Sequence, residues 1–242
     1  GFGPCTVVGI GPCTEKQQRW EKCAVVGSGG DLWQSGLGSQ IDAHDVVLRV
    51  NQAPCVGYER HVGSKTSLRL LNHRWTLKYS QEKRAPTAAQ HSASNPLEGG
   101  VQLLLTRSDD LDYERLLRYL RGARPDVSVR LLSSRVVSSV RDRLLVPFRA
   151  AANATCVEAL LVALEGGRDT PSSGLLAVAL MLQVCKQVTV FGFSGDSKRY
   201  HYFKSNRNYM NRTHSFSIER ALLRALARDG LIRFQGGNST YL

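Results

Sequence analysis

Short apolar runs alternate with amphipathic stretches along most of the chain. The apolar runs, rich in valine and leucine, predict buried strands; they cover residues 23–26, 46–50, 67–71, 101–105, 127–132, 188–193 and 231–234. Helical patterns lie between them; they cover residues 109–121, 135–145, 156–164 and 175–184, a turn through Leu32 and Trp33, and a last helix from Ser215 or Ser217 to Gly230. This alternation predicts an α/β fold with a mostly parallel sheet flanked by helices.

Two segments lack such periodicity. Residues 1–22 form an expected irregular lead-in, and residues 80–100 an expected long loop of the kind that binds ligands or covers sites. The chain has 242 residues, of which 42% are apolar, so we expect one domain over residues 1–242. No uninterrupted apolar run reaches the ~18 residues of a membrane span, and we expect any membrane anchor to lie upstream of this sequence.

The chain is strongly basic, with 32 Lys and Arg against 20 Asp and Glu and a net charge of +12. Such a surface attracts nucleic acids, anionic membranes or small anions alike. The arginines are scattered, without a run of like charges and without interleaved aromatic residues, which argues against nucleic acid. The composition therefore favours an anionic substrate.

Six cysteines occur without a Cys-x-x-Cys pair, so disulfides in a secretory compartment are a better interpretation than zinc. Three Asn-x-Ser/Thr sequons, at residues 153–155, 211–213 and 238–240, are consistent with that compartment. The motif Asp110-Leu-Asp112 matches a metal-binding Asp-x-Asp, but Ser108 could cap a helix there, where acidic residues are favourable anyway.

Two glycine-containing turns could bind an anion. The first, Gly27-Ser28-Gly29-Gly30, follows a predicted strand, and its glycines allow a phosphate to approach the backbone. A tight turn without a ligand has the same pattern, and the dinucleotide fingerprint lacks its third glycine. The second is the start of the apolar helix, residues 170–174, where unpaired amides favour an anion, although an ordinary helix cap looks alike.

Two histidines are candidates for acid–base chemistry. His214 directly precedes the last helix, and a helix N-terminus disfavours the protonated imidazole, so a neutral ring could act as a general base. A surface or capping histidine is the alternative. His201 lies in the cluster Tyr200-His201-Tyr202-Phe203, whose rings could pack in the core or form the floor of a sugar site; we favour the sugar site.

In this order the segments resemble the sialyl motifs of eukaryotic sialyltransferases. Residues 23–71 resemble the large motif. They contain Cys23-Ala-Val-Val-Gly, Ile41-Asp-x-His-Asp45, Asn51-x-Ala-Pro and Val62-Gly-x-Lys-Thr. The small motif resembles Pro171-Ser-Ser-Gly174 through Cys185 to Phe193; His201-Tyr202 resembles the third motif, and His214 with Glu219 the very small one. The resemblance covers close to half of the chain.

The resemblance implies a Rossmann-like variant of the GT-A glycosyltransferase fold that transfers a keto-sugar acid from CMP to a glycan in the Golgi lumen, without a metal or other cofactor. It implies a disulfide between Cys23 and Cys185. The implied catalytic residues are His214 as the base and His201 at the departing phosphate. The implied substrate-binding residues are Ser28, Gly29, Asn51, Ser172, Ser173, Gly174 and Tyr202.

The sequence departs from the family's pattern at Ser28, where asparagine is usual, and at Lys204, where many members carry an acidic residue. These departures leave open whether the sugar is sialic acid or a relative such as Kdo. They also leave open a catalytically inactive carbohydrate- or nucleotide-binding protein. The pairing of Cys5, Cys13, Cys55 and Cys156 is open as well.

Overall fold

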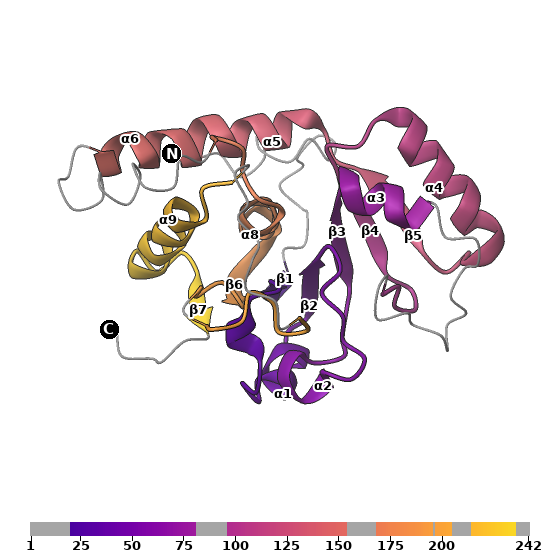
Figure 1. The fold of residues 1–242 in the computed structure, drawn as a ribbon, viewed down its shortest axis with the longest axis horizontal. Helices are drawn as coiled ribbons and strands as arrows, with labels where there is room; N and C mark the ends of the chain where they lie inside the picture. Colours follow the sequence, from indigo (N-terminus) through magenta and orange to yellow (C-terminus); the bar gives the residue numbers. More distant parts are fainter. Residues whose placement is uncertain (1–19, 81–95, 154–167, 196, 205–213, 236–242) are drawn as a thin grey trace.

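A computed structural model describes residues 20–80, 96–153, 168–195, 197–204 and 214–235. Its strands form one parallel sheet in the order β5-β4-β3-β2-β1-β6-β7 (Figure 1). The strands are β1 (Trp20–Val26), β2 (Val46–Val50), β3 (Leu68–Asn72), β4 (Gln102–Thr106), β5 (Ser128–Leu131), β6 (Cys185–Phe191) and β7 (Arg233–Gln235). The predicted α/β fold with a parallel sheet is confirmed.

Helices cover both faces of this sheet. They are η1 (Gly30–Leu32), α1 (Gly38–Asp42), α2 (Glu59–Val62), α3 (His73–Ser80), α4 (Asp110–Ala123), α5 (Ser134–Val140), η2 (Arg141–Leu145), α6 (Val146–Asn153), α8 (Ser173–Val184) and α9 (Phe216–Arg228). In Figure 1, α5, η2 and α6 run on as one long helical stretch along the top of the view.

The alternation of side chains along each strand divides the core. Val25 and Leu48 pack with the apolar helix α8 on one face, whereas Ala24 and Val47 pack with the segment of α1 and α2 on the other. Further along this second face, α3 and α4 pack on β4. Every residue of β2 is buried because it is covered on both sides, as expected of a central parallel strand.

The predicted strands agree with the observed ones to within a few residues, but some helix predictions were wrong. The expected helix through Leu32 is only a single 3-10 turn, because Gln34 and Gly36 adopt positive φ angles (60° and 70°) that a helix cannot continue through. Asp109, not Ser108, caps α4: its side chain accepts a hydrogen bond from Asp112 N.

Some expectations fall outside the described residues: the helix at 156–164, Cys5, Cys13 and Cys156, nearly all of the three sequons, and most of the lead-in and the 80–100 loop. Where the structure does describe a helix, none is both long and apolar enough to cross a membrane.

The strand order reverses at β1. The chain adds β2 to β5 on one side of β1, and then places β6 on the other side. In open parallel sheets, ligands bind beyond the carboxyl ends of the strands at such a switch point. The predicted disulfide between Cys23 and Cys185 is confirmed; it joins β1 to the start of β6, with the two Cα atoms 6.2 Å apart.

Candidate active site

The two predicted glycine turns meet on one side chain. Gly27 follows β1, and a Cβ atom added to it would lie 3.0 Å from Cε2 of Phe193, which follows β6. A Cβ atom at Gly174, in the first turn of α8, would lie 2.6 Å from Cε1 of the same ring. Glycine is therefore required in both turns for close packing, and the packing holds the two turns on the same side of the sheet.

His201 adjoins the first turn. Its Nδ1 lies 3.1 Å from the carbonyl oxygen of Ser28, and its ring stacks on Phe203 with centroids 5.0 Å apart. A carbonyl can only accept, so Nδ1 carries the proton and Nε2 is the acceptor in the neutral ring. Burial lowers the pKa of His201, and Lys204 lowers it further. The resting imidazole is therefore neutral and able to take up a proton.

Asn51 stands at the end of β2 with a positive φ of 49°. Its side-chain oxygen accepts a hydrogen bond from Asn72 N (3.1 Å), and its carbonyl accepts one from the buried guanidinium of Arg69 (2.7 Å). Arg69 is in turn ion-paired with Glu98. These contacts leave the Nδ2 amide of Asn51 without an acceptor among the described residues, so it is available to a ligand.

The start of α8 is fixed by a buried carboxylate. Ser172 caps the helix through Leu175 N, while Glu219 of α9 accepts hydrogen bonds from Ser172 N (2.7 Å) and Ser172 Oγ (2.5 Å). Burial raises the pKa of Glu219 to about 7. The amides of Ser173 and Gly174 have no acceptor among the described residues. They remain donors at the positive end of the helix dipole.

His214 lies beside the same helix start. Its Nδ1 is 2.8 Å from the carbonyl oxygen of Thr170, which fixes the proton on Nδ1 and leaves Nε2 as the acceptor. Burial lowers its pKa, and the nearby charge of Arg107 lowers it further. The two residues of the very small motif thus contact different residues before α8: Glu219 contacts Ser172, whereas His214 contacts Thr170.

Arg107 was not among the predicted site residues. It directly follows β4, has a positive φ of 59°, and donates hydrogen bonds to the carbonyl of Pro171 (2.8 Å) and to Ser173 Oγ (3.3 Å). It also lines a pocket of about 570 Å³ that contains several serine hydroxyl groups; the other lining residues are Ser108, Leu131, Leu132, Ser133, Ser134, Val137 and Ser138. A polar residue at the carboxyl end of a predicted parallel strand was the available sequence signal.

Tyr202 packs in the core and does not form the floor of a sugar site. Its side chain is completely buried, and its hydroxyl donates to the carbonyl of Pro54 at 2.6 Å. The ring packs in the core beneath α1 and α2 rather than lining an open sugar site, because the neighbouring Tyr58 and Phe203 rings surround it. The Tyr202 side chain is therefore not one of the substrate contacts that we propose.

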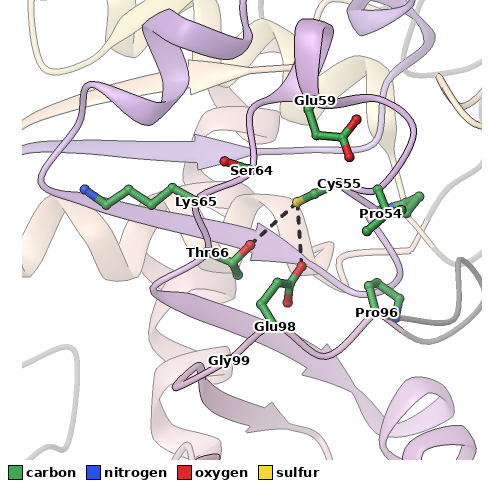
Figure 2. Close-up of a pocket in the computed structure, with 10 residues that line it drawn as sticks. Pro54, Cys55, Glu59, Ser64, Lys65, Thr66, Pro96, Glu98 and Gly99 are labelled. Atoms are coloured by element: carbon green, nitrogen blue, oxygen red, sulfur yellow. Dashed lines mark hydrogen bonds between the residues drawn. The ribbon is translucent and has the colours of Figure 1, made fainter. Parts of the chain in front are cut away.

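A further pocket, of about 450 Å³, lies where the chain leads into β3 and β4 (Figure 2). Cys55, a free and buried thiol, donates toward Glu98 there (3.6 Å) and contacts Thr66 Oγ1 (3.7 Å). Cys55 is therefore not part of a disulfide, which answers part of the open question of cysteine pairing. Burial raises the pKa of this thiol, so it is a poor nucleophile.

Asp112 of the Asp-x-Asp motif belongs to the helix rather than to a metal site. It is 4% exposed and contacts His73 (3.3 Å) and Arg115 (3.7 Å). Within the described ranges, no three His, Cys, Asp or Glu side chains gather closely enough to hold a metal ion.

The two glycine turns and a histidine with a lowered pKa thus lie near the strand-order reversal of a parallel sheet, an arrangement typical of nucleotide-binding domains. The sequence profile of glycosyltransferase family 29 (sialyltransferase) matches residues 9–231. The chain belongs to this family, as its motifs predicted.

Curated relatives and a solved structure agree with this assignment. CMP-N-acetylneuraminate-beta-galactosamide-alpha-2,3-sialyltransferase 2 of Mus musculus is 28% identical over 228 residues, covering 91% of this chain and 58% of the relative. The alpha-2,3-sialyltransferase 1 of Gallus gallus is 33% identical over 190 residues, covering 76% and 48%. The chain thus spans about half the length of the curated relatives it matches.

The crystal structure of a mammalian sialyltransferase aligns with a TM-score of 0.63 at 26% identity, over 90% of this chain and 70% of that one. The same values hold for a structure determined in complex with Gal-beta-1-3GalNAc-ortho-nitrophenol.

Proposed function

We propose that this chain is the catalytic domain of an inverting glycosyltransferase that moves sialic acid, or a related keto-sugar acid, from CMP to a glycan hydroxyl without a metal ion. The family, and relatives named for CMP-N-acetylneuraminate, support this donor. The observation that carries the proposal is the convergence of the Gly27 and Gly174 turns on Phe193, with His214 bound to the adjacent Thr170.

His214 acts as the base. The acceptor hydroxyl donates its proton to Nε2 as the oxygen attacks the anomeric carbon from the face opposite CMP, which inverts the configuration. The Thr170 carbonyl holds the tautomer that makes Nε2 the acceptor. The lowered pKa of His214 keeps the ring unprotonated as the pH falls toward the ordinary histidine value.

The departing CMP needs its phosphate charge compensated. The amides of Ser173 and Gly174 at the positive end of α8 supply fixed donors, and His201, once its Nε2 has taken up a proton from solvent, would donate a hydrogen bond to the departing phosphate. Bound phosphate would raise the pKa of His201, because a nearby negative charge favours the imidazolium. Ser28, Gly29 and Asn51 would hold the nucleotide at the ends of β1 and β2. Together these groups would make a metal ion unnecessary.

The pocket beside Arg107 suits the acceptor. It lies at the carboxyl ends of β4 and β5, next to the segment that His214 contacts, and its hydroxyl groups can bind sugar hydroxyls. Its ~570 Å³ falls within the size range of small-molecule sites. The relative whose structure contains a Gal-GalNAc derivative supports a glycan as acceptor. By the same family relationship, we propose that the protein works in the Golgi lumen.

Ser28 favours one alternative, a family member that binds CMP without turnover. Serine is shorter than the asparagine usual at this position, and the Ser28 carbonyl is already bonded to Tyr202 N (3.2 Å) and His201. The donor contact would then depend on Asn51 and the start of α8.

A donor screen distinguishes the two functions. Purified protein is incubated with CMP-N-acetylneuraminate or CMP-Kdo, with mixed glycan acceptors and EDTA, and CMP release is measured. Acceptor-dependent release with one donor is the expected result. CMP binding by calorimetry without release from either donor would support the inactive alternative, and absence of both would contradict nucleotide-sugar binding altogether.

A further inference from the structure

The guanidinium of Arg107 is held beside the base. His214 Nδ1 contacts the carbonyl of Thr170 at 2.8 Å, and Arg107 Nη1 donates to the carbonyl of Pro171 at 2.8 Å. These carbonyls belong to consecutive residues, whose Cα atoms are about 3.8 Å apart. The imidazole and the guanidinium are therefore neighbours on one short stretch of backbone.

Arg107 makes no ion pair with a carboxylate among the described residues. Its partners are two neutral oxygens, the Pro171 carbonyl and Ser173 Oγ. Glu219 is the acidic group whose charge reaches it, and that carboxylate already accepts both hydrogen bonds from Ser172. Arginine presents five donors in a planar fork, so a guanidinium with these contacts retains donors for an anion.

A hydroxyl group in contact with Arg107 adds a further hydrogen-bond donor. Ser173 Oγ accepts from Arg107 Nη2 at 3.3 Å, and its own hydroxyl hydrogen has no acceptor among the residues that the structure describes. Arg107 also lines the pocket beside α5, whose other lining side chains are neutral. Its positive φ is an uncommon conformation for arginine, of a kind that is concentrated at functional sites.

We propose that Arg107, together with Ser173, binds the carboxylate of the donor sugar and thereby makes the enzyme specific for keto-sugar acids. This inference rests on the proposed function. In such a sugar the carboxylate is bonded directly to the anomeric carbon. Because the base at His214 serves the hydroxyl that attacks this carbon, the carboxylate must lie within a few ångströms of the base, where Arg107 is held.

The test pairs a substrate change with a protein change. Kinetics of CMP release are measured for CMP-N-acetylneuraminate and for its carboxyl methyl ester, with the wild type, Arg107→Gln and Arg107→Lys, and CMP affinity is measured by calorimetry. Arg115→Gln is the matched control, because that side chain is 58% exposed on α4.

We expect Arg107→Gln to raise KM for the acid donor by about 10- to 100-fold, the usual worth of a hydrogen bond to a charged group. Its KM for the ester and its Kd for CMP should stay within about twofold of wild type, and Arg107→Lys should recover part of the loss, since it restores the charge without the planar fork. Arg115→Gln should behave as wild type.

Three results would overturn the inference. A wild type that turns over acid and ester equally well would leave the proposed function intact and remove the role of Arg107. If Arg107→Gln raised the KM for the donor and the Kd for CMP by the same factor, Arg107 would only support the start of α8. If Arg107→Gln raised the KM only for an acceptor that carries a carboxylate, the guanidinium would bind the acceptor and not the donor. A wild type that binds neither CMP nor donor would instead refute the proposed function itself.

Discussion

Glu219 is a carboxyl group that the fold encloses almost completely. It is 4% exposed, and both of its oxygens accept hydrogen bonds from Ser172. Burial disfavours the charged form more than these hydrogen bonds favour it, so its pKa rises from the ordinary 4.5 to about 7. The residue therefore links the conformation of the α8 start to pH.

The sign of its effect on stability follows from proton uptake. Between about pH 4.5 and 7 the folded chain holds a proton on Glu219 that the unfolded chain has lost, so the free energy of unfolding falls as pH rises through this window. The full effect is about 3 kcal/mol, since one pKa unit corresponds to about 1.4 kcal/mol.

We predict that Glu219→Gln reduces this pH dependence by most of that amount, because the amide cannot ionise. Urea unfolding at pH 5 and pH 7.5 measures it, with the exposed Glu114→Gln as control. If Glu219→Gln and the wild type lose the same stability between the two pH values, the carboxyl is not the titrating group.

The pair of central strands β1 and β6 is the element on which the site depends. The Gly27 turn follows β1, Phe193 follows β6, and the disulfide joins the two strands across 162 residues of sequence. Closing so long a loop restricts the unfolded chain strongly, which stabilises the fold by about 2–5 kcal/mol. Both cysteines are buried, so removing the bond also disturbs the core.

We predict that the double variant Cys23→Ala, Cys185→Ala loses about 2–5 kcal/mol of unfolding free energy and binds CMP more weakly, because the two turns are no longer tied together. Cys55→Ala is the control, since that thiol is free. Chemical denaturation and calorimetry provide the two readouts. A double variant as stable as the Cys55→Ala control would contradict a stabilising role for the disulfide.

The central strands could be predicted from the sequence because they are buried on both faces. Val46–Val50 is predicted with its observed bounds because a central strand must be apolar throughout. In contrast, α1 and α2, of five and four residues, are too short to show a helical period. The turn at Gln34 was missed because a positive φ at a residue other than glycine has no clear sequence signal.

At the scale of the whole molecule, the parallel topology explains why residues far apart in sequence meet. The Gly27 turn, Asn51 and Arg107 all follow strand ends, which lie at the same edge of the sheet. The motifs predicted most of this set, but not Arg107, whose role appears only when β4 is placed beside the start of α8. Whether Tyr202 packs in the core or lines the sugar site likewise depends on tertiary packing, which the sequence alone does not provide.

The net charge of +12 also has a meaning at this scale. A basic surface raises the local concentration of anionic substrates, and the CMP-linked sugar acid of the proposed function carries negative charge on both its phosphate and its carboxylate. Among the partners that the composition alone left open, the proposed function therefore selects a small anion.

The rate of CMP release by His214→Ala, at saturating donor and acceptor, is the decisive test of the proposed mechanism. We predict a loss of about 10²- to 10⁴-fold in kcat, the usual contribution of a general base, with unchanged CMP affinity and with His73→Ala, on α3, close to wild type. A His214→Ala protein that retains full turnover would contradict the assignment of this imidazole as the general base.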